Sequence, residues 1–374
     1  MKKKAVAAGH ICIDITPTFL GEKVSEVSQI LQPGKLINVG DVDVHTGGSV
    51  ANTGLVMKIL GADVYLAGKI GDDSFGDMIM KVVSRYEGAE KGLIRREGES
   101  SSYSVVLALP GIDRIFLHNP GANDTFTADD LSDELLEGAA LFHFGYPPIM
   151  KQMFVNDGDG LVEAMKKARD AGAATSLDLA AVDPNAKSGK ANWELILKKT
   201  LPYVDIFVPS VEELCFMLDR EKFENLQKRA AGRDICEILD LEEDIKPLAD
   251  KCMAMGAKIL LIKCGVPGMY YRTSSEEVLK TISPALELDT AAWADKDAFE
   301  RSSVPDRFRS GTGAGDTSIA AFLTALLDGY GPEKCMQYAT ATGAMCVSAY
   351  DALSGLLPFE ELEKRIQAGW EKNA

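Results

Sequence analysis

Short apolar runs alternate with amphipathic stretches along most of the chain, and this alternation constrains the fold more than any other feature. The apolar runs have the length and composition of buried strands: Ala5–Ile13, Val64–Ile70, Leu141–Phe144, Thr175–Leu179, Ile206–Val208 and Ile259–Lys263. Helical periodicity is found in Ser49–Leu60, Ser74–Tyr86, Leu161–Ala171, Trp193–Lys199, Val211–Leu218 and Leu241–Met255. Alternating strands and helices predict an α/β fold with a central, mostly parallel sheet and helices on its faces.

Two regions depart from this alternation and are interpreted as a small β layer. Residues of about 15–45 and 93–117 are strand-like with polar alternation, and the second region contains a hairpin around Pro110–Asp113. We expect both to be lid segments inserted in a single domain that spans 1–374. The charged segments Asp219–Asp240 and Asp289–Arg309 are expected to be peripheral. Three helices are predicted to close the chain: Asp316–Leu327, Pro332–Ser348 and Pro358–Trp370.

Charge and cysteine usage exclude several classes of protein. The 374 residues include 40 basic and 56 acidic side chains, which gives a net charge of −16. Nucleic acids and anionic membranes require a basic face on their partners, so neither is expected to bind. No window reaches the roughly 18 apolar residues of a membrane span. The seven cysteines are scattered without a CxxC pair, which is typical of a reducing compartment, and we expect a cytoplasmic protein.

The stretch 309–322, RSGTGAGDTSIAAF, places a carboxylate directly behind a glycine-rich loop. Glycines allow positive φ angles and let another molecule approach the main chain closely. The apolar run after Asp316 predicts a buried helix, and a glycine loop that leads into a helix gathers unpaired N–H groups around an anion. A carboxylate beside a bound anion points to chemistry at Asp316, the alternative being a simple helix cap after a flexible turn.

Other known site motifs are poorly matched. The Gly-Lys pairs at 34–35, 68–69 and 189–190 are not followed by Ser or Thr, so a P-loop is not predicted. GTGAG differs from GxGxxG and lies late in the chain, which only weakly supports a dinucleotide-binding dehydrogenase. The four histidines are isolated from one another in the sequence, and a zinc site is not expected.

A second glycine-rich stretch, 45–76, reads HTGGSVANTGLVMKILGADVYLAGKIGDDSFG. With GTGAGDTSIAAF about 260 residues later, it makes the chain resemble the ribokinase-like (PfkB) carbohydrate kinase family. The resemblance runs from Val6 to about Pro358 and includes GIDRIFLHNPGAN (111–123), HFGY (143–146), SLDLA (176–180), FVPSVEEL (207–214) and LIKCGVPGMYYR (261–272). It implies a ribokinase-like three-layer α/β/α fold with a small β-sheet lid over the acceptor.

The resemblance also implies transfer of the γ-phosphoryl group of ATP to a primary alcohol. Asp316 would be the base that takes the proton from the acceptor hydroxyl, because an alcohol becomes a useful nucleophile as its proton leaves. The backbone N–H groups of Gly313, Ala314 and Gly315 would form an anion hole for the charge that develops on the phosphoryl group. Phosphoryl transfer depends mostly on positioning and electrostatics, so such a loop is sufficient.

Further roles follow from the same resemblance, residue by residue. The residues expected to bind acceptor hydroxyls are Asp14, Gly47, Gly48 and Asn52. Glu213 matches the glutamate of an NxxE motif that indirectly organises Mg²⁺ and phosphate. The positions on the nucleotide side are Lys263, Gly265 and Gly268, together with Thr342 and Cys346 in the segment 341–348 that would border the adenine.

Two departures from the family pattern limit what the resemblance implies. Ser210 stands where the asparagine of NxxE is usual, so the resemblance extends to Glu213 but not to the fine Mg²⁺ network. Ser310 and Gly311 replace an Asp-Thr pair whose aspartate helps hold a monovalent cation in relatives, so potassium activation is doubtful here.

We predict an ATP- and Mg²⁺-dependent kinase of a sugar or sugar-like small molecule. The alternatives left open are a nucleoside kinase of the same family and a catalytically silent sugar- or nucleotide-binding regulator, with a dehydrogenase a distant third. The exposed strands of the lid are natural dimerisation edges, so a homodimer is also expected. The sequence does not give the acceptor or the hydroxyl that is phosphorylated.

Overall fold

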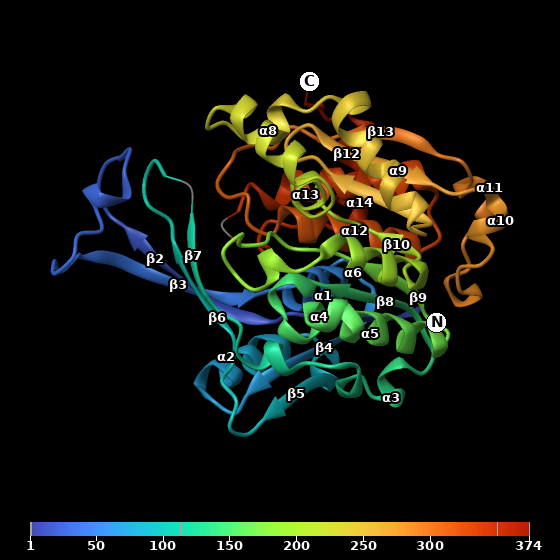
Figure 1. Ribbon diagram of the computed structural model, residues 1–374, viewed down its shortest axis with the longest axis horizontal. Coiled ribbons are helices and arrows are strands. Elements are labelled where there is room, and N and C mark those ends of the chain that lie inside the picture. Colours follow the sequence, from blue (N-terminus) through green and yellow to red (C-terminus); the bar gives the residue numbers. More distant parts are fainter. Residues whose placement is uncertain (1, 113, 350, 374) are drawn as a thin grey trace.

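The computed structural model describes residues 2–112, 114–349 and 351–373. Figure 1 shows a layered body with a smaller sheet projecting from one side. The body is built on a nine-stranded sheet. In spatial order its strands are β13 (Asp297–Arg301), β12 (Gly268–Thr273), β11 (Ile259–Lys263), β10 (Ile206–Phe207), β9 (Ala174–Leu177), β8 (Ala139–Gly145), β1 (Lys4–Gly9), β4 (Asp63–Gly71) and β5 (Gly92–Arg96). The strands from β11 to β5 are parallel to their neighbours, and β12 and β13 add an antiparallel edge.

Helices cover both faces of the large sheet because its strands are apolar on both sides, as parallel strands require. In β1, Ala5 and Ala7 belong to one hydrophobic cluster, while Val6 and Ala8 belong to the other. One face packs against α1 (Ser49–Ile59), α2 (Ser74–Val83), α10 (Glu276–Leu279), α11 (Thr290–Trp293), α12 (Ala314–Leu327), α13 (Pro332–Cys346) and α14 (Phe359–Gln367). The other face packs against α3 (Asp133–Leu136), α4 (Lys151–Phe154), α5 (Asp159–Asp170), α6 (Trp193–Thr200), α7 (Val211–Leu218), α8 (Arg220–Ala230) and α9 (Lys246–Ala254). The predicted three-layer α/β/α fold is confirmed.

The smaller sheet contains β3 (Val39–Gly47), β2 (Cys12–Phe19), β6 (Tyr103–Leu107) and β7 (Ile115–Asn119), in this order. It is the projecting lobe of Figure 1, and we call it the lid sheet. β6 and β7 form the predicted hairpin, although Asp113 in its turn lies outside the described residues. The predicted boundary at residue 93 is wrong, because β5 pairs with β4 in the large sheet and the lid strands of this segment begin at Tyr103.

The first apolar run does not form one strand. The prediction of a single strand over Ala5–Ile13 is wrong, because the chain leaves the large sheet after Gly9 and enters the lid sheet at Cys12. Gly9 has a φ of 123°, and a Cβ there would lie 2.2 Å from the carbonyl oxygen of Gly145. The backbone can therefore turn here only with glycine, and this turn connects the two sheets.

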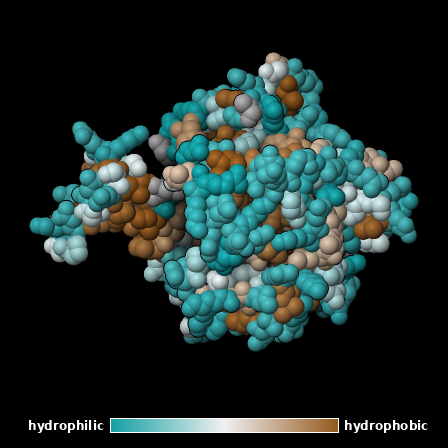
Figure 2. Space-filling model, turned by 45° about the horizontal axis from the view of Figure 1, so that its top comes forward, coloured by the Kyte–Doolittle hydropathy of each residue, from teal (hydrophilic) through white to brown (hydrophobic). Residues whose placement is uncertain are grey.

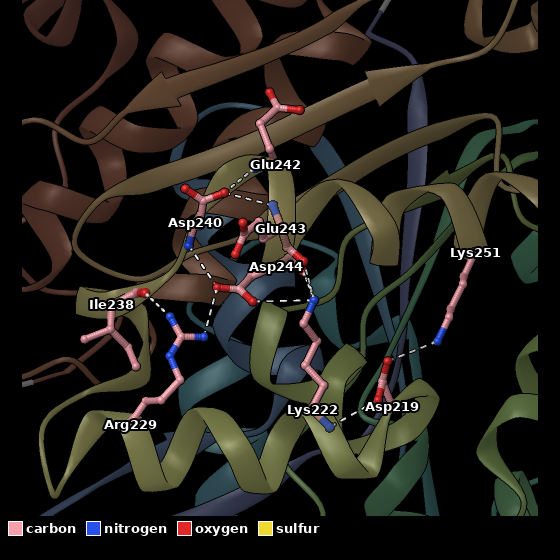
Figure 3. Close-up of polar contacts among 9 residues, drawn as sticks. All are labelled: Asp219, Lys222, Arg229, Ile238, Asp240, Glu242, Glu243, Asp244 and Lys251. Atoms are coloured by element: carbon pink, nitrogen blue, oxygen red, sulfur yellow. Dashed lines mark hydrogen bonds and ion pairs between the residues drawn. The ribbon is translucent and has the colours of Figure 1, made fainter.

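The two charged segments expected to be peripheral are structural parts of the body. Asp289–Arg309 contains β13, the edge strand of the large sheet, and this prediction is corrected. Asp219–Asp240 contains α8, which is held by the buried carboxylate of Asp244 through ion pairs with Lys222 (3.5 Å) and Arg229 (3.6 Å). Figure 3 shows how the Asp244 side chain points between these two cations. The segment can pack closely because its charges are paired across elements.

The predicted helix Leu241–Met255 begins differently from the prediction. A wider π-type turn over Leu241–Ile245 precedes α9, and Asp240 caps it by accepting hydrogen bonds from the N–H groups of Glu242 and Glu243. The three helices expected at the end of the chain are present as α12, α13 and α14. Among the described residues, we find no helix with the length and apolar character needed to cross a bilayer.

Candidate active site

A cleft of about 1170 Å³ opens at the carboxyl ends of the parallel strands. Ligands of open α/β sheets bind at this edge because the connections there lead into helix N-termini. Several residues that line the cleft come at or just after a strand end: His10 follows β1, Tyr146 follows β8, Asp178 follows β9, and Lys263 ends β11. The glycine loop 311–315 and Asp316 line the same cleft.

The glycine loop turns tightly into α12. Gly313 has a φ of 75° and is the residue before the helix, and a Cβ there would lie 2.5 Å from the Cβ of Ala352. The N–H of Ala314 donates to the carbonyl of Gly311 at 3.3 Å. Within the described part of the chain, the N–H groups of Gly313 and Gly315 donate no backbone hydrogen bond outside the regular elements, although the carbonyl of Gly313 accepts one from the N–H of Thr317 at 2.8 Å. As N-terminal N–H groups of a helix, they lack partners inside it and are the ones open to an anion.

Asp316 lies in the first turn of α12 and is almost completely buried. Its carboxylate accepts a hydrogen bond from Asn52 Nδ2 at 3.0 Å and from the hydroxyl of Tyr146, which lies 2.9 and 2.8 Å from its two oxygens. Burial raises the pKa of Asp316, whereas Lys263 and the two hydrogen-bond donors act in the opposite direction. A raised pKa suits a carboxylate that must accept a proton during a reaction near neutral pH.

A buried cation stands beside this carboxylate. Lys263 Nζ donates to Asp178 Oδ1 at 2.6 Å, and both side chains are largely buried. A Cβ at Gly315 would lie 3.7 Å from Lys263 Nζ, so the ammonium group also borders the glycine loop. Burial lowers the pKa of Lys263, but the nearby carboxylates, with Asp178 first, outweigh it and raise the pKa. The lysine therefore presents a positive charge where an anion would meet the loop.

Burial likewise raises the pKa of the Asp178 carboxyl. Lys263 acts against this increase, and the carboxylates of Glu213 and Asp316 add to it. Three carboxyl groups, those of Asp178, Glu213 and Asp316, surround the one ammonium group of Lys263 in this part of the cleft. Acidic groups therefore outnumber basic groups in this region. A ligand that brings its own cation would therefore fit it well.

Glu213 is held at the start of α7 by Ser210. The hydroxyl of Ser210 accepts from the N–H of Glu213 at 3.2 Å, and the N–H of Ser210 donates to Glu213 Oε2 at 2.6 Å. This is a reciprocal capping box, which satisfies two N–H groups at the helix start. Serine thus keeps the glutamate in place where the sequence pattern led us to expect asparagine.

The opposite end of the cleft lies under the lid sheet. Asp14 on β2 accepts a hydrogen bond from Cys12 Sγ at 3.4 Å. A Cβ at Gly47 would lie 2.2 Å from Asp14 Oδ2, and one at Gly48, whose φ is 83°, would lie 2.5 Å from the carbonyl of His10. The paired glycines are therefore required by close approach. Asp14, Gly48 and Asn52 line the cleft, whereas Gly47 lies behind Asp14.

Two histidines complete this end of the cleft. The rings of His10 and His118 lie 5.0 Å apart, and Ser104 Oγ is 3.0 Å from His118 Nδ1. Burial lowers the pKa of both histidines, so both are neutral at physiological pH and each can donate and accept a hydrogen bond. Together with Asp14 and Ser104, they form a polar wall suited to a hydroxylated ligand.

The nucleotide-side predictions are only partly brought together. Gly265 and Lys263 line the cleft, but Gly268 does not. Thr342 and Cys346 are buried in α13, and Cys346 Sγ lies 3.5 Å from the carbonyl of Thr312. Cys346 therefore contacts the glycine loop from behind, and neither side chain is among the residues that line the cleft.

Sequence reasoning assigned no role to Tyr146, Asp178, His10 or His118. The first three immediately follow a strand of the large sheet, and the rule that parallel sheets bind ligands at their carboxyl ends could have found them. His118 lies on β7, and its position depends on the pairing of that strand with β6. The sequence predicts that hairpin, but no local pattern indicates which of its two faces turns toward the cleft.

Mg²⁺ suits this site as a companion of phosphate groups. In the portion of the chain that is described, no group of three or more His, Cys, Asp or Glu side chains could hold a metal. Mg²⁺ keeps several waters and usually binds through substrate phosphates with few protein carboxylates. Glu213, which lines the cleft near Lys263, fits an indirect role toward such an ion.

Comparisons with known proteins agree in the kind of protein they indicate. The family model described as pfkB family carbohydrate kinase matches residues 3–358. The chain is 25% identical to probable fructokinase-2 of Arabidopsis thaliana over 372 residues, which covers 95% of this chain and 93% of that protein. It is also 25% identical to an uncharacterized sugar kinase of Archaeoglobus fulgidus over 297 residues, which covers 79% and 96% of the two chains.

Solved structures share the fold. A ribokinase of Arabidopsis thaliana complexed with ribose and ATP superposes with a TM-score of 0.69 at 20% identity, covering 97% of this chain and 98% of the other. A fructokinase of Xylella fastidiosa with bound ATP gives a TM-score of 0.70 at 19% identity, covering 98% and 99%. At these identities the likeness concerns the fold.

Proposed function

Because the chain belongs to the pfkB family of carbohydrate kinases, we propose that it transfers the γ-phosphoryl group of ATP to a primary hydroxyl of a sugar or sugar-like small molecule. The observation that carries this proposal is the position of Asp316. Its buried carboxylate lies directly behind a glycine loop with open N–H groups, in a cleft that also contains a polar acceptor end. A base and an anion site are thus adjacent, as a kinase requires.

Asp316 acts as the general base. The acceptor hydroxyl donates a hydrogen bond to the carboxylate and loses its proton to it, while the hydroxyl oxygen forms a bond to the γ-phosphorus. The bond from phosphorus to the bridging oxygen of ADP breaks at the same time. The raised pKa of Asp316, which follows from its burial, brings its basicity closer to neutral pH and so favours this role.

The glycine loop and Lys263 serve the phosphate groups. Open N–H groups of Gly313 and Gly315 and the N-terminal end of the α12 dipole stabilise charge on the transferring group. Ala314 contributes mainly by shaping the turn, since its N–H donates to Gly311. Mg²⁺ would arrive with ATP and supply further charge neutralisation, with Glu213 organising it indirectly. We propose no direct adenine contact for Thr342 and Cys346, which are buried in α13 and do not line the cleft.

The polar wall favours a free sugar over the alternatives. Asp14, Ser104, His10 and His118 offer carboxylate, hydroxyl and imidazole groups to ligand hydroxyls. A nucleoside would be expected to need more apolar or aromatic cover, and Phe116 is the aromatic side chain of the lid that lines the cleft. A catalytically silent binder has no need of a base held by two hydrogen-bond donors.

The test is ADP release from Mg-ATP across pentoses, hexoses, sugar acids and nucleosides, with and without potassium. We expect turnover with at least one sugar, a loss of about 10²–10⁴-fold in Asp316→Asn, and little effect of potassium. Asp328→Asn at the other end of α12 is the matched control and should keep full activity. Binding of ligands without any turnover would favour the silent regulator, and undiminished activity of Asp316→Asn would refute the role of Asp316.

A further inference from the structure

Both oxygens of the Asp316 carboxylate are engaged by protein donors. Asn52 Nδ2 donates to Oδ2 at 3.0 Å. The hydroxyl of Tyr146 lies 2.9 Å from Oδ1 and 2.8 Å from Oδ2. A phenol has one proton, so it can hold one oxygen firmly or share its proton between the two. Among the described residues, Tyr146 is therefore the only one that donates a hydrogen bond to Oδ1.

Tyr146 reaches Asp316 through an unusual backbone conformation. It follows β8 directly and has a φ of 69° and a ψ of 39°, in the left-handed region. Residues other than glycine and asparagine rarely occupy this region, and such conformations cluster at functional sites. Two prolines follow Tyr146 and begin a short 3-10 turn, which fixes the chain direction. The ring lies beside His10, with ring centroids 6.2 Å apart, and the side chain lines the cleft.

We propose that Tyr146 is a positioning residue for the catalytic base: its hydroxyl orients the Asp316 carboxylate and yields Oδ1 to the acceptor hydroxyl. The inference rests on the proposed function of Asp316. When the acceptor hydroxyl donates to Oδ1, the O–H group of Tyr146 keeps its proton and directs its hydrogen bond to Oδ2 alone. Oδ2 then accepts from both Tyr146 and Asn52. A carboxylate oxygen can accept two hydrogen bonds, so this rearrangement leaves every donor satisfied. Oδ1 is then the atom that receives the acceptor proton.

Other charged groups near Asp316 do not replace this contact. The titratable groups that act on Asp316, or on which it acts, lie on several elements: Lys263 at the end of β11, Glu213 in α7, Asp178 after β9, and Cys346 in α13. Lys263 Nζ is engaged with Asp178. Removal of the Tyr146 hydroxyl alone should therefore shift the midpoint of the Asp316 titration.

The test is a pH titration of Asp316 in the unliganded protein. It is monitored by ¹³C NMR of aspartate labelled at the carboxyl carbon. Asp316→Asn identifies the signal by its disappearance. Tyr146→Phe keeps the ring and removes the hydroxyl, so the charged carboxylate loses a hydrogen-bond donor. The midpoint of the Asp316 titration should therefore rise by about one pH unit. With the acceptor found by the activity screen, the acid limb of kcat/KM should move to higher pH by a similar amount. We also expect kcat to fall about tenfold, with KM for ATP unchanged.

Tyr338→Phe is the matched control, because the hydroxyl of Tyr338 donates to another carboxylate, Glu363 Oε2, at 3.0 Å. It should leave the midpoint of Asp316 unchanged. An unchanged midpoint in Tyr146→Phe would overturn the inference, even if the enzyme proves to be a kinase. Activity retained in Asp316→Asn would instead refute the proposed function, and the NMR titration separates these two outcomes because it needs no turnover.

Discussion

Ser210 shows how one side chain can preserve the geometry of a site after the residue type has changed. Its hydroxyl accepts from the N–H of Glu213, and the glutamate carboxylate accepts in return from the N–H of Ser210. Serine and asparagine are comparably good residues at the N-cap of a helix. The departure noted in the sequence therefore leaves the orientation of Glu213 at the cleft intact.

We expect Ser210→Ala to lower the free energy of unfolding by about 1 kcal/mol, because the first turn of α7 loses its side-chain cap. Ser210→Asn should restore most of that stability, since asparagine caps equally well. Urea unfolding followed by circular dichroism measures both variants. If the alanine variant and the unmodified protein have equal free energies of unfolding, the side-chain cap does not contribute to stability.

At the scale of elements, α8 illustrates how a charged segment becomes part of the body. Asp244 is buried in the turn before α9. Its carboxylate accepts from the N–H of Asp240 at 3.0 Å and also pairs with Lys222 and Arg229. The two ion pairs join α8 to the turn before α9, and the bond from Asp240 closes that turn (Figure 3). The same segment contributes Asp234 and Cys236 to the cleft. Its docking therefore affects the shape of the site.

We expect Asp244→Asn to destabilise the protein by about 1–3 kcal/mol, the usual cost of losing a hydrogen bond to a buried charged group. The cost should stay in this range because Lys222 and Arg229 are 21% and 49% exposed and can turn to water. Glu242→Gln breaks an exposed pair with Lys246 and should change stability by less than about 0.5 kcal/mol. Chemical unfolding of the two variants compares them, and a similar effect of both would contradict the structural role of Asp244.

At the scale of the whole molecule, the lid sheet has two chemically different faces. The register of its strands places Ile15, Pro17, Val42, Val44, Val105 and Leu117 on one face. Asp14, Ser104 and His118 lie on the other face, which lines the cleft. Val42, Val44 and Leu117 are strongly exposed, and apolar residues gather on this lobe in Figure 2. A contiguous exposed apolar face indicates an interaction site.

We propose that a second copy of this chain covers the apolar face and expect a homodimer in solution. Val42→Lys should produce a monomer, because a lysine would be buried without a partner in the interface. Asp43→Lys places the same side chain one residue away, on the opposite face, and should remain dimeric. Light scattering after size-exclusion chromatography measures the masses. A monomeric unmodified protein, or a dimeric Val42→Lys variant, would refute the proposal.

Much of the fold was predictable because its signals are local. Apolar runs of strand length identified six strands of the large sheet, since parallel strands buried on both faces must be apolar throughout. The strands β12 and β13 were missed, because an antiparallel edge carries polar residues such as Arg272 and Glu300 and gives no continuous run. The division of the first run into β1 and β2 was also missed. The turn at Gly9 is made beside the backbone of Gly145, which is distant in the sequence.

The sequence by itself determined the α/β class, the family and the place of Asp316 behind its glycine loop, because each depends on residues close together in the chain. Only the tertiary structure decided what surrounds that carboxylate. Tyr146 and Asn52 meet Asp316 across 170 and 264 residues, and Lys263 meets Asp178 across 85. Contacts of this range follow from the spatial order β11, β10, β9, β8 and β1 in the sheet. This order is set by the packing of the whole chain rather than by any local pattern.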